Sequence, residues 1–169
     1  MNRFRSVVAS VTLSLAASQA GAQSGVLIPL NATQPDASVL SLEQMTVNVT
    51  IDVTTVSTGV TQRDNDLKSA KFFDATQFPT ATFVSTSVSK SGTGLTVSGN
   101  LTLHGVTKPV VLQVDGPTGP VNGMDKKPHA GFSATTTFKR TDFAIAAGYP
   151  ATVVGDDVAL TIDLDVAKQ

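Results

Sequence analysis

The chain has 169 residues, a formal net charge of −1 and no cysteine, and only 15% of its residues are charged. The small net charge excludes electrostatic binding to nucleic acid or to an anionic membrane surface. The absence of cysteine excludes disulfides and thiol chemistry. No linker, repeat or block of charge divides the chain, so we predict one folded domain.

The first 22 residues, MNRFRSVVASVTLSLAASQAGA, have the features of a signal peptide. Arg3 and Arg5 precede an apolar run, and the segment ends in the A-x-A pattern of Ala20 and Ala22. The apolar run is too short to cross a bilayer as a helix. We therefore predict cleavage after Ala22 and a mature periplasmic domain of residues 23–169 without a transmembrane segment.

Apolar and polar residues alternate through much of the remaining chain, which is typical of half-buried β-strands. Turn residues separate short runs of this kind, and the short spacing favours an antiparallel meander. A meander with one apolar face must close into a barrel or pack as a sandwich. Gly99 falls in an apolar position and predicts a bend or a bulge. The predicted strands are 46–56, 80–89, 95–105, 108–116, 131–140 and 158–167.

The stretch 63–83, RDNDLKSAKFFDATQFPTATF, does not alternate and holds four of the eight phenylalanines. Thr61 and Asp64 have the spacing of a capping box, which predicts a helix of about two turns. Pro79 then favours an extended chain. We interpret the helix and its aromatic residues as a cap over one end of a barrel. The alternative is ordinary core beneath a long connection.

Three stretches, in this order, resemble the YceI-like family of exported bacterial proteins. They are RDNDLKSAKFFDATQFPTATFVST at 63–86, GNLTLHGVTKPVVLQV at 99–114 and GFSATTTFKRTDFA at 131–144. The resemblance implies a lipocalin-like antiparallel barrel. It also implies that the interior binds a polyisoprenoid, an isoprenoid quinone or a long-chain fatty amide.

The sequence departs from the family pattern in two places. About two N-terminal strands of the family, including an ID-x-x-HS signature, are missing. The barrel is therefore expected to be incomplete, with an open sheet edge. A partner chain, as in a homodimer, or a rearranged N-terminus could fill the gap. Ala144 stands where the family usually has glycine. If this position requires a positive φ, alanine strains it.

Inward-facing apolar side chains are the residues expected to line a lipid cavity, although each could instead fill a solid core. Arg63 and His104 are candidates for contact with a polar lipid head group. The predicted lining residues are Val49, Ile51, Phe72, Phe73, Phe78, Phe83, Leu101, Leu103, Leu112, Phe132 and Leu164.

The sequence offers little for catalysis. His104 and His129 are the two histidines, and neither has the spacing of a metal ligand. Neither a nucleophile elbow nor a phosphate-binding glycine loop occurs. We predict no catalytic residue, no metal and no cofactor, and a lipid-binding role in transport, storage or stress response. The alternatives are a structural or adhesive β-sandwich and, more distantly, a hydrolase that uses His104.

Overall fold

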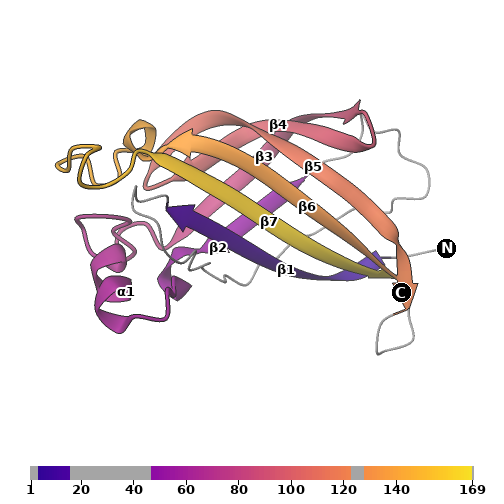
Figure 1. Cartoon of the computed structure of the whole chain (residues 1–169), viewed down its shortest axis with the longest axis horizontal. Helices are drawn as coiled ribbons and strands as arrows, with labels where there is room; N and C mark the ends of the chain where they lie inside the picture. Colours follow the sequence, from indigo (N-terminus) through magenta and orange to yellow (C-terminus); the bar gives the residue numbers. More distant parts are fainter. Residues whose placement is uncertain (1–3, 16–46, 123–127, 169) are drawn as a thin grey trace.

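The computed structural model describes residues 4–15, 47–122 and 128–168 of the chain (Figure 1). Almost all of this part is β-structure, with one short helix and an aromatic segment between two strands, as the sequence predicts. The elements in chain order are β1 (Phe4–Leu15), β2 (Asn48–Asp52), η2 (Val53–Thr55), α1 (Thr61–Lys68), β3 (Thr80–Ser91), β4 (Gly94–Leu103), β5 (Val106–Asn122), β6 (Pro128–Lys139), η3 (Arg140–Phe143) and β7 (Asp157–Lys168).

The described strands form one antiparallel sheet with the order β1-β7-β6-β5-β4-β3-β2. Strands β2 to β7 therefore follow one another in space as they do in the chain, which confirms the predicted meander. The sheet curls into a half-barrel (Figure 1). Because the described strands belong to a single sheet, the two-sheet sandwich considered as an alternative is wrong as an architecture.

The N-terminal segment of the described chain lies at one edge of this sheet. Strand β1 pairs with β7, and Val11 and Leu13 lie opposite Ile162 and Leu160. The sequence VASVTLS within β1 alternates apolar and small polar residues, which favours a strand. The edge beside β7 is thus filled by the chain's own N-terminus, within the stretch predicted to be a signal peptide.

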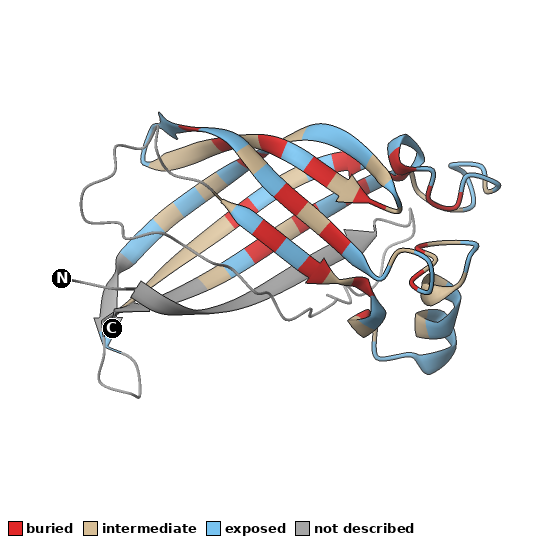
Figure 2. Ribbon diagram, turned by 180° about the vertical axis from the view of Figure 1, so that it is seen from behind, coloured by how far each residue is buried: buried red, intermediate tan, exposed pale blue. Residues whose placement is uncertain are grey.

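The inner face of the sheet is apolar and the outer face is polar, because side chains on a strand point alternately to the two sides. On β7, Val158, Leu160 and Ile162 are buried, whereas Ala159 and Asp163 are exposed. Figure 2 shows the same alternation of buried and exposed residues along the neighbouring strands. Burial of each aliphatic side chain contributes about 1.5–3 kcal/mol, so this inner face supplies most of the stability.

Strand β2 is shorter than the strand predicted over 46–56. It ends at Asp52, whose Oδ1 accepts hydrogen bonds from the Thr54 backbone N–H (2.9 Å) and the Thr54 hydroxyl (2.6 Å). These bonds turn the chain into the 3-10 turn η2. A short polar side chain that bonds to the backbone two residues on is a common way to end a strand.

The bulge predicted near Gly99 is confirmed. It lies on β3, the strand that pairs with β4 at Gly99. Ser85 pairs with Gly99 and Ser87 with Ser98, so β3 carries one extra residue at this point. The Phe83 ring lies where a Cβ on Gly99 would be, and Gly99 is buried. The glycine therefore lets an aromatic ring lie flat against the inner wall of the sheet.

Ala144 has the strained conformation that the sequence analysis anticipated. It ends η3 with φ 55° and ψ 20°, in the left-handed region that costs a residue with a Cβ about 1 kcal/mol or more. We expect Ala144→Gly to raise the free energy of unfolding by about 0.5–1 kcal/mol. Chemical denaturation of the two proteins checks this, and an equal or lower stability of the variant contradicts it.

Candidate functional site

The predicted lining residues of the strands do converge on the inner face of the sheet. Most are buried, while those on β6 and β7 are half-buried. Nearly all belong to, or pack against, one apolar cluster. Whether a lipid touches these side chains stays a prediction. The lining residues that the strands contribute are Val49, Ile51, Phe83, Leu101, Leu103, Leu112, Phe132 and Leu164.

The aromatic segment after α1 lies at one end of the half-barrel (Figure 1). Phe73 is buried in the apolar cluster, and Phe72 stacks on Tyr149 with the ring centroids 5.7 Å apart. Helix α1 ends at Lys68 and buries none of its own residues. The aromatic residues Phe72 and Phe73 therefore lie beyond the helix and not on one of its faces.

His104 and Gly105 form the two-residue turn between β4 and β5, with φ 51° and 72°. The half-buried His104 ring places Nδ1 3.1 Å from the Phe143 carbonyl oxygen, so Nδ1 carries the proton and donates it. Phe78 packs edge-on against this ring at 4.8 Å. His104 thus connects the β4–β5 turn to η3, and its contact with a lipid head group stays a prediction.

Arg63 and Asp64 both bind the Thr58 loop that precedes α1. Asp64 Oδ1 accepts hydrogen bonds from the Thr58 backbone N–H (2.7 Å) and hydroxyl (2.5 Å), while Arg63 donates to the Thr58 hydroxyl oxygen (2.8 Å) and carbonyl oxygen (3.1 Å). The hydrogen bond from the Thr58 side chain lowers the pKa of Asp64 below its ordinary value of 3.8. The capping box predicted between Thr61 and Asp64 is wrong, because the helix takes Val60 as its N-cap.

Arg140 is the residue at this end that the sequence analysis missed. It is 1% exposed, and its guanidinium group donates five hydrogen bonds of 2.7–3.1 Å to backbone carbonyl oxygens. A stretch of twelve residues without a charged side chain, 144–155, follows it closely in the sequence. The backbone carbonyl groups of a long apolar loop need hydrogen-bond donors when they are buried. An arginine close to such a loop in the sequence is a candidate donor, and this pattern could have pointed to Arg140. The accepting residues are Ile145, Ala146, Tyr149, Val154 and Gly155.

Asp156 also attaches the 144–155 loop to η3. Its Oδ1 accepts hydrogen bonds from the Thr141 hydroxyl (2.8 Å) and backbone N–H (3.2 Å). The bond from the Thr141 side chain, followed by nearby Lys139 and Arg140, lowers the pKa of Asp156 below 3.8. The C-terminal end of the 144–155 loop is therefore fixed to η3, where its N-terminal end begins.

A groove of about 410 Å³ lies between α1 and the 144–155 loop. Its walls are largely apolar, and a charge of each sign, on Arg63 and Asp66, lies at its edge. Because Phe72 and Tyr149 stack beside it, the two walls are held together. The groove is lined by Val60, Gln62, Arg63, Asp66, Leu67, Phe72, Val153, Val154 and Gly155.

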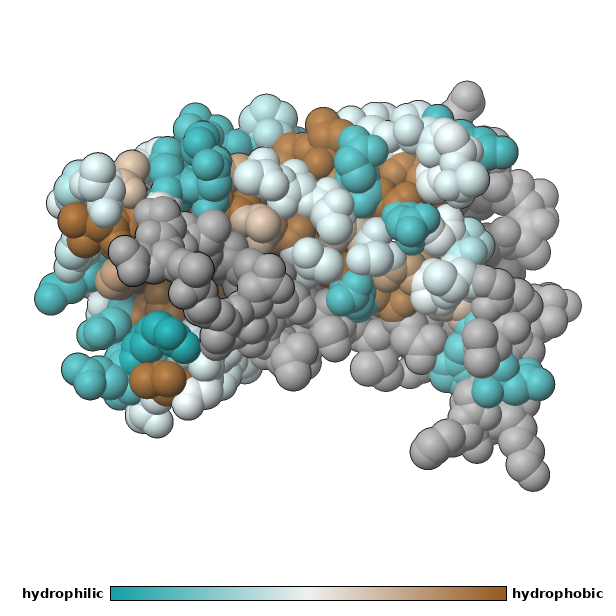
Figure 3. Space-filling model, viewed as in Figure 1, coloured by the Kyte–Doolittle hydropathy of each residue, from teal (hydrophilic) through white to brown (hydrophobic). Residues whose placement is uncertain are grey.

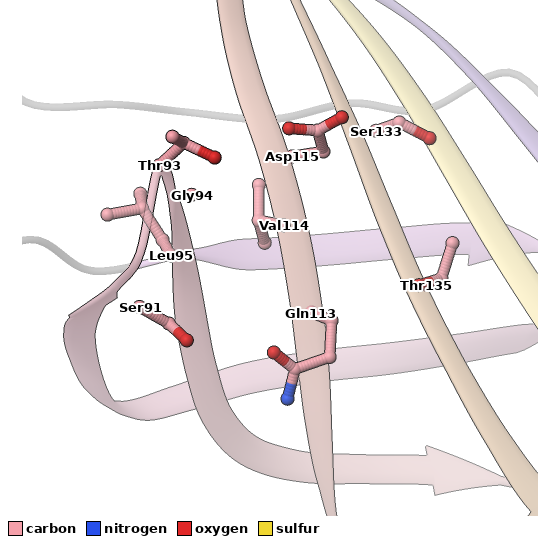
Figure 4. A pocket seen from close by; sticks show the side chains of 9 residues that line it. All are labelled: Ser91, Thr93, Gly94, Leu95, Gln113, Val114, Asp115, Ser133 and Thr135. Carbon is pink, nitrogen blue, oxygen red and sulfur yellow. The ribbon is translucent and has the colours of Figure 1, made fainter.

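A second hollow, of about 400 Å³, lies toward the other end of the sheet, at the β3–β4 turn (Figure 4). Most of its lining is hydroxyl, amide and carboxylate groups, with Leu95 and Val114 as its larger apolar residues. Within the described ranges, no group of three His, Cys, Asp or Glu side chains could hold a metal ion. The hollow is lined by Ser91, Thr93, Gly94, Leu95, Gln113, Val114, Asp115, Ser133 and Thr135.

In the part of the chain that the structure describes, no helix has the length and apolar character that crossing a bilayer requires.

Solved structures with this architecture come from several bacteria. The YceI protein of Campylobacter jejuni superposes with a TM-score of 0.75 at 28% identity, covering 91% of this chain and 90% of that one. Burkholderia cenocepacia BcnA gives 0.73 at 23% identity, covering 93% and 95%. A polyisoprenoid binding domain from Saccharophagus degradans gives 0.58 at 14% identity, covering 99% and 97%. At such low identity the last two show the fold alone.

Sequence comparison gives the family. Protein YceI of Salmonella arizonae is 42% identical over 128 residues, which are 73% of this chain and 63% of the Salmonella protein. The chain thus spans less than two thirds of the length of that relative. The model of the YceI-like domain matches residues 3–166. With nearly the whole chain matched and the half-barrel shared, the protein belongs to the YceI-like family.

Proposed function

We propose that the protein binds a lipid with a long apolar tail, of the polyisoprenoid, isoprenoid-quinone or fatty-amide class, against the inner face of its half-barrel. In this proposal it is a carrier or store of that lipid in the periplasm, without catalysis and without a cofactor. The related fold of a polyisoprenoid binding domain from Saccharophagus degradans supports the lipid class.

The observation that carries the proposal is the largely apolar character of the inner face. From β2 to β7, most inward positions are aliphatic or aromatic, with Ser85 and Thr136 among the exceptions, while carboxylate side chains such as Asp163 project outward. The one buried charged side chain among the described residues, Arg140, is saturated by carbonyl oxygens and offers nothing to a substrate. Such a surface can recognise a hydrocarbon chain and little else.

The energetics suit a reversible carrier. Removing one methylene from water gains about 0.8 kcal/mol, so a tail of some twenty carbons gains on the order of 10 kcal/mol before costs. Loss of translational freedom and ordering of the tail cancel a large part of this gain. Micromolar binding therefore requires only an enclosed apolar wall, without a reactive or charged group.

Mass spectrometry of organic extracts tests the proposal. Protein purified from the periplasm, and protein incubated with ubiquinone and then passed over a sizing column, should both yield a stoichiometric apolar lipid. A matched extract of the flow-through supplies the background. Protein that carries no lipid after either treatment would leave a purely structural or adhesive role as the better account.

We also propose that residues 1–22 direct export and are removed after Ala22. Removal would take β1 away and leave β7 with a free edge, which a second copy of the chain could pair with. Intact-mass measurement of the periplasmic protein should show a chain that starts at Gln23. A mass that includes residues 4–15 would mean that β1 stays in the mature sheet.

A further inference from the structure

We propose that the end of the half-barrel that carries α1 and the 144–155 loop docks on the surface of a lipid bilayer through apolar contacts. The docking surface, called here the apolar tip, consists of the exposed residues Val60, Pro150, Ala151 and Val153. The inference rests on the proposed function, since a carrier of a bilayer lipid must meet the bilayer to load and unload.

The first observation is where exposed apolar side chains gather. Among the described residues, four large hydrophobic side chains are exposed, and Val153 is the most exposed of them at 66%. Val60, at 49%, faces the same groove from the opposite wall. The other two, Val84 and Val111, lie on the outer faces of β3 and β5. Figure 3 shows hydrophobic surface at the α1 end of the molecule.

The second observation is the absence of charge on the 144–155 loop. Its twelve residues are AIAAGYPATVVG, and the eight exposed or half-exposed positions other than glycine present only methyl, ring or hydroxyl groups to solvent. The opposite wall carries Arg63 and Asp66, one charge of each sign. A surface of this composition suits the boundary between head groups and hydrocarbon, and it offers no attraction specific to anionic lipids.

The third observation is that the loop is held in place. Arg140 binds five of its carbonyl groups, Phe72 stacks on Tyr149, and the Val153 and Val154 backbone N–H groups both donate to the Pro150 carbonyl oxygen. Val153 is therefore presented at the end of a rigid turn. A fixed apolar side chain loses little conformational entropy when it enters an apolar phase.

A protein partner fits these observations less well. A stable protein interface buries about 800 Å² on each side and usually has aromatic or arginine anchors at its centre. The apolar tip has two valines, one proline and one alanine, and only the two valines line the groove of about 410 Å³. Insertion of a surface of this size into a bilayer is shallow, and the binding that it gives is weak and reversible.

The test compares Val153→Glu with Val111→Glu, a valine of similar character on the outer barrel wall that is 46% exposed. Each protein is mixed with sucrose-loaded phosphatidylcholine vesicles, with and without ubiquinone, and sedimented. Val153→Glu should lower the vesicle-bound fraction by about tenfold, because the exposed valine that enters the bilayer in this proposal is replaced by a charge. Val111→Glu should bind as the unchanged protein does, and added salt should not release any of the three.

Three results would overturn the inference: equal vesicle binding by the two variants, release by salt, or a concentration-dependent dimer of the unchanged protein that Val153→Glu abolishes. Vesicle binding is also measured without ubiquinone. The protein can therefore bind vesicles through the apolar tip even if extraction shows that it carries no lipid. Conversely, if extraction yields a lipid and the two variants sediment alike, the proposed function stands and the docking surface is wrong. The melting temperature of each variant confirms that it is folded.

Discussion

Arg140→Leu should lower the free energy of unfolding by about 3 kcal/mol or more. The leucine fills similar space but donates no hydrogen bond, so the five carbonyl oxygens bound by the guanidinium group lose their donors inside the protein. Denaturant unfolding followed by circular dichroism measures the loss. The loop 144–155 should also become sensitive to proteases, since Arg140 is its main attachment.

Arg140→Lys and Lys139→Leu are the matched comparisons. Lysine keeps the charge but has three donors on one atom, which cannot reach carbonyls that surround a planar group, so most of the loss should remain. Lys139 is half exposed and pairs with Asp157 on the surface, so its replacement should cost about 1 kcal/mol at most. A loss of the same small size for Arg140→Leu would show that the carbonyls find other donors.

Ala134→Phe should reduce the amount of bound lipid by about tenfold while the protein stays folded. Ala134 is a small buried residue on the inner face of β6, between Val114 and Ile162 on the adjacent strands. A phenyl ring there takes the space that an isoprenoid tail would occupy along the wall. The measurement is lipid per protein after incubation with ubiquinone, together with the free energy of unfolding.

The control is Thr135→Phe, the next residue along β6, which is exposed on the outer face. It should leave the lipid load unchanged. If the interior is solid, Ala134→Phe would instead overpack it and cost about 1–3 kcal/mol of stability, with no selective loss of lipid. That result would mean that the half-barrel has no space for a bound lipid.

The sequence predicted the strands, their order and their inner faces well. Alternation at period two is a local property, so residues such as Leu101 and Leu112 could be assigned to the inner face before their neighbours were known. The helix after η2 was also predicted, although it does not begin with the expected capping box. The conformation of Ala144 was anticipated from the resemblance to the YceI-like family, which usually has glycine there, and not from a local pattern. The stretch 4–15 shows the limit of this reading, because an apolar run with small polar residues fits both a signal peptide and an edge strand.

The tertiary structure decided how polar groups are paired. Asp64 caps the Thr58 loop rather than the helix start, and Arg140 is buried among carbonyls although arginine is usually exposed. These outcomes depend on which backbone groups lose contact with water, and a loop's path through space determines that. Hydrophobic burial follows a repeating pattern that the sequence displays, whereas a hydrogen-bond partner exists only once the chain has folded around it.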